Sequence, residues 1–252
     1  MPRKHLKFLF TAGAIASLVA CSTLADPTGT ETQAALNAPE RSAEHKARDS
    51  NRRPADVIAF SGIKRGDKIV EIAPASGYYT ALLSHVVGPT GHVYGIGPER
   101  IFDVFANARN TFPEYAVKDP RANVSYSTAR LDEVVLPEGM DQVWMVLYYH
   151  DTYWTGENRT EMNKRFYDAL RPGGVYYVID HVGPTDTEDD ITKTLHRLDT
   201  RHALSEIQAA GFRLDAESVI LRNADDPRDV SVFDETWRGR TDRVVWKFEK
   251  PR

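Results

Sequence analysis

Cysteine is almost absent from this chain of 252 residues, in which Cys21 is the only one. A single cysteine excludes any disulfide within the chain, so a packed core must provide the stability that crosslinks give to small secreted domains. Hydrophobic residues make up 41% of the chain and aromatic residues 10%, which is enough for such a core. Beyond residue 53, the length suits one domain of roughly 200 residues.

Positive charge is also scarce. The formal net charge is −4, and the only long basic cluster lies at the N-terminus. Proteins that bind nucleic acid carry a basic patch or stripe on the binding domain. The composition therefore does not support a nucleic-acid partner.

No apolar run is long enough to span a bilayer. The longest, residues 8–20, follows Arg3, Lys4 and Lys7, and this order predicts a targeting segment rather than a transmembrane helix. The run ends in Leu18-Val19-Ala20-Cys21, which resembles a bacterial lipobox. In such a motif the cysteine is lipidated and becomes the new N-terminus.

The resemblance implies a signal peptide over residues 1–20 and a lipid anchor at Cys21. Ser22, where an aspartate would retain the protein at the inner membrane, implies sorting to the periplasmic side of the outer membrane. We therefore expect an envelope protein that contacts the membrane through its lipid anchor only. Cleavage removes three basic and no acidic residues, which changes the formal charge from −4 to −7. The alternative is an ordinary signal peptide with a chance cysteine.

Large apolar side chains are few between residues 22 and 53, which are rich in Thr, Ala, Asn, Glu and Arg. This composition predicts a flexible tether over residues 21–53. Pro54 then begins a predicted helix, since proline is accommodated at the first helical position. We place the folded domain at residues 54–252.

Residues 68–80 carry the most informative local pattern. An apolar run at 69–73 predicts a buried strand, small residues follow at 74–77, and helical spacing begins at Tyr78. Strand, tight turn and helix form the first unit of a nucleotide-binding α/β fold, in which backbone N–H groups and a helix N-terminus approach the ligand. The turn has one glycine, Gly77, so it does not support the three-glycine fingerprint of a nicotinamide or flavin dehydrogenase. The alternative is a turn that serves only close packing.

The rest of the chain predicts a mostly parallel sheet with helices on both faces. Six further strands are expected at 92–96, 123–126, 142–149, 175–179, 212–221 and 243–248. Helices are expected between them at 101–110, 158–170 and 200–210. The last two strands have no helix between them, so we expect them to pair antiparallel at one edge.

Four stretches carry a family resemblance. They are Val70-Glu71-Ile72-Ala73-Pro74-Ala75-Ser76-Gly77, Leu131-Asp132 with Pro137, Met140-Asp141-Gln142-Val143, and Ala169-Leu170-Arg171-Pro172-Gly173-Gly174 before a strand that ends at Asp180. From about residue 54, the chain resembles a class I methyltransferase, a Rossmann-like seven-stranded fold that uses S-adenosylmethionine. More narrowly, residues 148–151, 196–199 and 231–234 resemble an uncharacterised group of predicted bacterial methyltransferases.

The resemblance implies which residues bind the cofactor. They are Glu71, Ala73, Ser76, Gly77, Tyr78, Glu99, Asp132 and Leu147. Glu71 would lie near the methionine part, Gly77 near its carboxylate and Asp132 near the adenine amino group. The chain departs from the family pattern at Ala73 and Ala75, where glycines are expected. It also has Gly97 where an acidic residue would bind the ribose, and Glu99 is the predicted substitute.

The predicted catalytic residues are His150, Asp151 and His181, which follow the fourth and fifth strands. Ligands bind at the carboxyl ends of strands in such sheets, and a histidine there can accept a proton near neutral pH. His150 is the first choice as a base. Alternatively, His150 and Asp151 form a hydrogen-bonded pair that only ends the strand. His196 joins this cleft or forms a surface pair with Asp199.

We predict an enzyme that transfers a methyl group from S-adenosylmethionine to a small-molecule acceptor. One alternative is an envelope binding module that kept the methyltransferase scaffold and lost or changed its activity. Another is a metal-dependent enzyme with ligands among Glu71, His150, Asp151, Asp180 and His181. The preferred site contains no metal, and the sequence determines neither the acceptor nor the oligomeric state.

Overall fold

A computed structural model describes residues 27–104, 122–186 and 189–252. The predicted signal peptide, Cys21 and the start of the predicted tether lie outside these ranges, as does the second half of the helix expected at 101–110. Within the described residues, every helix is too short or too polar to cross a bilayer.

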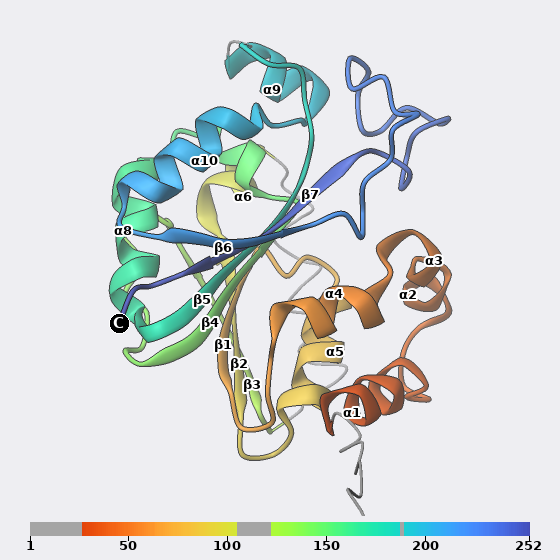
Figure 1. Cartoon of the computed structure of the whole chain (residues 1–252), viewed down its shortest axis with the longest axis vertical. Helices are drawn as coiled ribbons and strands as arrows, with labels where there is room; N and C mark the ends of the chain where they lie inside the picture. The colour runs from red at the N-terminus through yellow and green to blue at the C-terminus, as the bar shows by residue number, and fades with distance from the viewer. Residues whose placement is uncertain (1–26, 105–121, 187–188) are drawn as a thin grey trace, which may run out of the picture.

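The described part of the chain forms a seven-stranded sheet in the order β3-β2-β1-β4-β5-β7-β6 (Figure 1). The strands are β1 (Lys68–Ile72), β2 (His92–Pro98), β3 (Val124–Ala129), β4 (Met140–Val146), β5 (Leu170–His181), β6 (Arg213–Ser218) and β7 (Arg243–Glu249). Strands β1 to β5 are parallel, and β7 is antiparallel to both β5 and β6. The predicted Rossmann-like sheet is confirmed, with its antiparallel last strands.

Burial explains the difference between central and edge strands. In β1, Ile69, Val70 and Ile72 are all buried. A central parallel strand has helices over both faces, and its sequence is therefore a nearly continuous apolar run. The edge strand β6 alternates between exposed and half-buried residues instead. The periodicity of the sequence thus places the strands near their observed positions.

Helices cover both faces of the sheet, and each face has its own hydrophobic cluster. The helices are α1 (Pro27–Leu36), α2 (Ala43–Ala47), α3 (Asp49–Arg52), α4 (Pro54–Ser61), α5 (Tyr78–Val87), α6 (Glu99–Val104), α8 (Arg159–Ala169), α9 (Asp189–Leu195), α10 (Thr200–Ala209) and the 3₁₀-helix η1 (Tyr149–Tyr153). Helices α1, α4 and α5 pack on one face, and α6, α8 and α10 on the other (Figure 1).

The segment expected to be a tether is folded from residue 27 onward. Ala35 of α1 is fully buried against α4 and α5. Arg41 forms an ion pair with Asp49 at 2.6 Å, and Asp49 also accepts a hydrogen bond from the Tyr78 hydroxyl of α5 at 2.7 Å. Alanines and buried polar contacts pack this segment against the domain. Its composition is poor in large apolar residues and therefore did not predict that it is folded. The folded domain therefore begins before the predicted boundary at residue 54.

One predicted turn lies inside a strand. Residues 171–174 fall within β5, whose pairing with β4 shifts register between Met140 and Gln142. Gly173 has a φ of 74°, which favours glycine. The expected Pro-Gly-Gly bend thus forms an irregular start of β5.

Candidate functional site

A cavity of about 290 Å³ lies at the carboxyl ends of β1, β2 and β4. Strand order reverses between β1 and β4, because the chain adds β2 and β3 on one side of β1 and β4 and β5 on the other. Loops leave the sheet in opposite directions at such a switch point, and the crevice between them is where open α/β sheets bind ligands. The volume is close to the lower end of small-ligand pockets, roughly 300 Å³.

The turn after β1 keeps a glycine-type backbone without the glycines. Ala73 and Ala75 have φ values of 54° and 49°, and Gly77 has 76°. The left-handed region costs a non-glycine residue roughly 1–2 kcal/mol. The surrounding bonds hold it: Ala73 N–H donates to Ile96 O at 2.9 Å, and Gly77 N–H donates to Pro74 O at 2.8 Å. The turn therefore has the backbone shape that glycines favour, although alanines occupy two of the three positions where glycine was expected.

Glu71 forms the base of the cavity. It is 3% exposed and accepts a hydrogen bond from Thr80 Oγ1 at 2.6 Å. Burial raises the pKa of this carboxyl to about 7, although the bonds from Thr80 oppose the rise. Glu71 therefore exchanges a proton near neutral pH.

Tyr126 fills the position where an acidic side chain was expected at residue 97. A Cβ on Gly97 would lie 2.1 Å from Tyr126 Oη and 2.9 Å from Phe102 Cζ, so a larger residue would require both side chains to move. The predicted substitute, Glu99, does not line the cavity. Its carboxylate accepts a hydrogen bond from Thr128 Oγ1 at 3.1 Å in an exposed position. Its predicted role is therefore not supported.

Two arginines of the N-terminal segment line the cavity, and the sequence did not predict them. Arg48 and Arg52 contribute to one wall. The Arg52 guanidinium lies 4.7 Å from the centre of the Tyr78 ring, and His45 Nε2 lies 3.2 Å from Ser76 Oγ of the turn. Their only sign in the sequence is that four of the eight residues at 46–53 are basic. The expectation of a tether hid its meaning.

The profile of the family described as Protein-L-isoaspartate(D-aspartate) O-methyltransferase (PCMT) matches residues 47–191, which is more than half of the chain. The chain belongs to this family. The match begins at α2 and therefore includes Arg48 and Arg52. S-adenosylmethionine is the cofactor of this methyltransferase family.

Curated relatives of this PCMT-family chain match it in part. A protein-L-isoaspartate O-methyltransferase of Ignicoccus hospitalis is 42% identical over 55 residues, which are 22% of this chain and 25% of the relative. The ubiquinone/menaquinone biosynthesis C-methyltransferase UbiE of Pseudomonas fluorescens is 24% identical over 139 residues, 52% of this chain and 48% of the relative. The matches thus span between a quarter and about half of the relatives' length.

Solved structures share the fold of this family member at low sequence identity. A methyltransferase of Aquifex aeolicus that depends on S-adenosylmethionine has a TM-score of 0.55 and 17% identity, covering 77% of this chain and 88% of that one. One from Mesorhizobium loti has a TM-score of 0.56 and 15% identity, covering 80% and 99%. The [4+2]-cyclase SpnF has a TM-score of 0.58 and 12% identity, covering 89% and 93%. The fold therefore does not by itself determine the reaction.

The residues of the cavity fit the family cofactor. Arg48 and Arg52 offer guanidinium groups that suit a carboxylate. Ile101 and Phe102 offer an apolar wall that suits a flat ring. The turn at 73–77 offers the close backbone approach that a nucleoside needs.

Six of the predicted site residues line the cavity of this family member. They are Glu71, Ala73, Ser76, Tyr78, Leu147 and Asp151. Gly77, the N-cap of α5, is not among the lining residues, although its neighbours Ser76 and Tyr78 are. Asp132 does not line it: its carboxylate binds Arg100 at 3.0 Å and accepts the Asn158 N–H at 3.0 Å. The structure thus does not support a contact between Asp132 and an adenine in this cavity.

His150 lies behind the cavity wall and is 3% exposed. Its Nδ1 lies 2.7 Å from Asp180 Oδ1, and its Nε2 lies 3.2 Å from Asp151 Oδ1. Burial alone would lower the pKa of this imidazole, but the charges of Asp180 and Asp151 outweigh burial and raise the pKa to about 10. Because His150 also does not line the cavity, its predicted role as the base is not supported.

Asp151 is the predicted catalytic residue that reaches the cavity. Burial alone would raise the pKa of its carboxyl, but His150 and His196 lower it to about 2. His181 does not reach the cavity: its Nδ1 lies 2.7 Å from Thr241 Oγ1, and burial together with nearby cations lowers its pKa. We therefore retain Asp151 as the candidate for contact with an acceptor.

Three sequence stretches that lie far apart meet beside Asp151. His196 Nδ1 lies 3.1 Å from Asp151 Oδ1, and the Phe233 ring centre lies 4.8 Å from that of His196. His196 thus joins this region. Asp199 instead caps α10 by accepting the Arg201 N–H at 2.9 Å.

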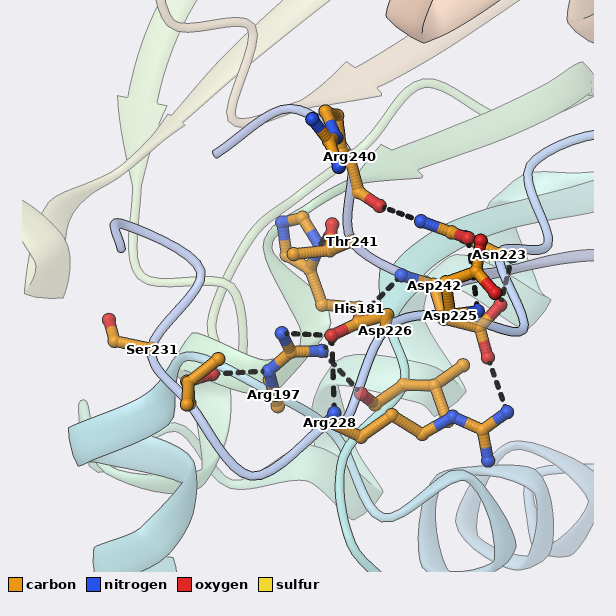
Figure 2. A network of polar contacts seen from close by, with 12 residues as sticks. His181, Arg197, Asn223, Asp225, Asp226, Arg228, Ser231, Arg240, Thr241 and Asp242 are labelled. Carbon is orange, nitrogen blue, oxygen red and sulfur yellow. Dashed lines mark hydrogen bonds and ion pairs between the residues drawn. The ribbon is translucent and has the colours of Figure 1, made fainter. Parts of the chain in front are cut away.

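A polar network holds the loop that carries Phe233. Figure 2 shows the Arg197 guanidinium bound to both carboxylate oxygens of Asp226, at 2.8 and 3.0 Å. Asp226 in turn accepts the Asp242 N–H at 2.5 Å, and Arg228 pairs with Asp242 at 2.9 Å. Residues 219–242, between β6 and β7, are thereby fastened at the carboxyl end of β5.

Proposed function

We propose that this protein transfers the methyl group of S-adenosylmethionine to an oxygen or nitrogen of a small-molecule acceptor. The observation that carries the proposal is the glycine-type turn at residues 73–77, which borders a cavity at the switch point of a methyltransferase sheet. Two alanines of this turn, Ala73 and Ala75, are in a strained backbone conformation. Strain of this kind clusters at ligand sites, which supports a bound cofactor rather than a scaffold without one.

Methyl transfer is an in-line displacement that depends mainly on positioning. When bound, the cofactor supplies a methyl group made electrophilic by its sulfonium. Arg48 and Arg52 would hold its carboxylate, and Glu71 would accept a hydrogen bond from its amino group. Asp151 would orient the O–H or N–H of an acceptor, since its carboxylate stays ionised at the cavity wall.

The dimensions of the cavity support a small acceptor. A cavity of about 290 Å³ is close to the lower end of small-ligand pockets, roughly 300 Å³. Helices α2 and α3 carry Arg48 and Arg52 to one side of this space, which narrows access from that direction. The acceptor would therefore approach from the side of Tyr148 and Asp151.

Isothermal titration with S-adenosylmethionine and S-adenosylhomocysteine tests the proposal. We expect both to bind, and we expect Arg52→Gln to weaken binding roughly tenfold or more, because a bond to a charged group contributes about 1.5–3 kcal/mol. The matched control is Arg53→Gln. Arg53 pairs with exposed Asp56 and does not line the cavity. The absence of heat at millimolar ligand would instead favour a scaffold that has lost its activity.

We propose in addition that the protein is a lipid-anchored envelope protein, on the sequence pattern of residues 1–21 alone. Fractionation of cells that express the wild type or Cys21→Ala tests this. The wild type is expected in the outer-membrane fraction, and the variant is expected to leave it. Equal distribution of the two proteins would contradict a lipid anchor at Cys21.

A further inference from the structure

His150, Asp151 and His196 form a compact group of potential metal ligands. One ligand atom from each lies within 4.8 Å of the others. Asp151 Oδ1 lies 3.2 Å from His150 Nε2 and 3.1 Å from His196 Nδ1. Ligands about 2.0–2.2 Å from a tetrahedral zinc ion are separated by roughly such distances.

The ring of His150 is oriented in the way that metal-binding histidines usually are. Asp180 is fully buried, and its carboxylate contacts His150 Nδ1 at 2.7 Å. It also accepts the N–H groups of His150 at 2.8 Å and His181 at 2.7 Å, which fixes its position. A carboxylate on one ring nitrogen turns the other nitrogen toward the metal and raises its basicity. Here, that other nitrogen points to Asp151.

His196 is held in an uncommon backbone conformation. Its φ is 53°, a region that non-glycine residues rarely adopt and that costs of order 1–3 kcal/mol. The rings of Trp154 and Phe233 flank its imidazole, with centroid distances of 5.7 and 4.8 Å. The neighbouring Arg197 anchors the segment through Asp226 (Figure 2). The strained backbone of His196 lowers the stability of the fold, and the surrounding contacts hold its imidazole against Asp151.

We propose that His150 Nε2, the Asp151 carboxylate and His196 Nδ1 bind a divalent transition-metal ion of the zinc type. Two nitrogens and one oxygen match the ligand sets of catalytic zinc sites, which keep a further position open. Asp180 serves as the outer carboxylate that orients His150. This ligand set differs from the group expected from the sequence, because His181 contacts Thr241 and Glu71 contacts Thr80 instead.

The proposed metal ion would lie where it could act on the methyl acceptor. This role rests on the proposed function. Asp151 also lines the cavity, so a metal bound to its carboxylate would lie beside the place proposed for the methyl acceptor. A bound divalent ion favours the ionised form of a hydroxyl. The site would therefore select an acceptor with a hydroxyl or carboxylate oxygen. Metal binding itself requires no cofactor and stands independently.

A second group within the described residues also satisfies the distance criterion: Asp186, Asp199 and His202. It is the weaker candidate. Asp186 and His202 are exposed, Asp186 pairs with Arg201 at 2.6 Å, and Asp199 caps α10. His202 therefore provides a matched control for His196.

The test is a titration of chelator-treated, full-length protein with Zn²⁺, without cofactor, followed by calorimetry. A parallel titration with Co²⁺ is followed by its visible spectrum. We expect one equivalent to bind. Asp180→Asn should weaken binding by roughly 10–100-fold, as loss of outer-shell partners does, and His196→Gln should weaken it more. His202→Gln and His92→Gln should bind as the wild type does.

Three results would overturn the proposal: no Zn²⁺ binding at micromolar concentrations, equal affinity in wild type and His196→Gln, or loss of binding in His202→Gln alone. Either of the first two results would show that His150, Asp151 and His196 form a chain of hydrogen bonds and no metal site. Thermal unfolding checks that His196→Gln folds. If His196→Gln does not fold, the wild type is tested by NMR of its histidine rings. The proposal then requires that Zn²⁺ shifts the signals of His150 and His196 and leaves that of His92 unchanged. Titration of metal-free protein with S-adenosylhomocysteine tests the proposed function separately.

Discussion

In the turn after β1, two alanines have a backbone conformation that glycine favours. Ala73 and Ala75 both occupy the left-handed region. Glycine reaches that region without a steric penalty, whereas alanine does not. The tertiary contacts of the turn must therefore offset this strain, and replacement by glycine should relieve it.

Ala73→Gly is expected to leave the free energy of unfolding unchanged or to raise it by up to about 1 kcal/mol. Relief of the left-handed strain offsets the extra entropy that glycine has in the unfolded chain. The control is Ala59→Gly at an exposed position inside α4, which should lower stability by about 1 kcal/mol. Urea denaturation measures both. Equal losses in the two variants would show that residue 73 is not strained.

The buried carboxyl of Glu71 should make stability depend on pH. Its folded-state pKa of about 7 lies above the ordinary value of 4.5, so the folded protein binds more protons than the unfolded chain between these values. The free energy of unfolding should then fall as pH rises from about 4.5 to 7, by up to about 3 kcal/mol, and change no further above that. Glu71→Gln removes this contribution.

Urea denaturation at pH 5 and pH 8 measures the effect as a difference between wild type and Glu71→Gln. The wild type should lose more stability over this interval than the variant does. Glu99→Gln is the control, since Glu99 is in an exposed contact. Parallel pH profiles for wild type and Glu71→Gln would contradict a raised pKa at Glu71.

The position of the connection between β6 and β7 depends on a buried ion pair. Arg197 is 1% exposed and Asp226 is 4% exposed. Arg197 also donates to the main-chain oxygens of Val182 and Val230, at 2.9 and 2.7 Å. These bonds join the end of β5 to the loop that brings Phe233 over His196, as Figure 2 shows for Arg197 and its neighbours.

Arg197→Met should lower the free energy of unfolding by about 3–5 kcal/mol, because it leaves the Asp226 carboxylate buried without its partner. The matched control is Arg213→Met. Arg213 pairs with Glu249 at 2.9 Å but is 60% exposed, so its loss should cost about 0–1 kcal/mol. Chemical denaturation compares the two. Similar small losses would show that the buried pair contributes no more than a surface pair.

At the scale of the whole molecule, residues of the N-terminal helices and of the sheet line one cavity. Residues 41–52 contact the turn and α5 through Asp49, His45 and Arg52. A cofactor in the cavity would add contacts to both parts at once. Its binding free energy should therefore appear as stability of the whole chain and as protection of this segment.

S-adenosylhomocysteine at 100 times its dissociation constant should stabilise the folded state by about 2.7 kcal/mol and raise the Tm by several degrees. Amide hydrogen exchange should slow in residues 41–52 as well as in the turn. Arg52→Gln should reduce both effects at the same ligand concentration. Protection confined to the turn would show that the N-terminal helices take no part in binding.

Much of the fold was predictable from the sequence, because its causes are local. Apolar runs placed the strands, small residues placed the turn after β1, and the missing helix between the last strands predicted their antiparallel pairing. Part of the site was predictable as well, because the family resemblance implied Glu71 and Ser76 and the position after the fourth strand indicated Asp151. Arg48 and Arg52 were missed because their segment was predicted to be a tether, and Tyr126 was missed because nothing in the sequence places its side chain against Gly97.

The sequence by itself determined the strand order along the chain, the turn and the family resemblance, because each depends on neighbours in the chain. Only the tertiary structure showed that His150 is buried between Asp151 and Asp180, 30 residues away, whose charges outweigh burial and raise its pKa to about 10. It also decided that His196 reaches Asp151 across 45 residues and that α1 to α3 belong to the domain. Charge and packing act through space, and sequence periodicity does not record those distances.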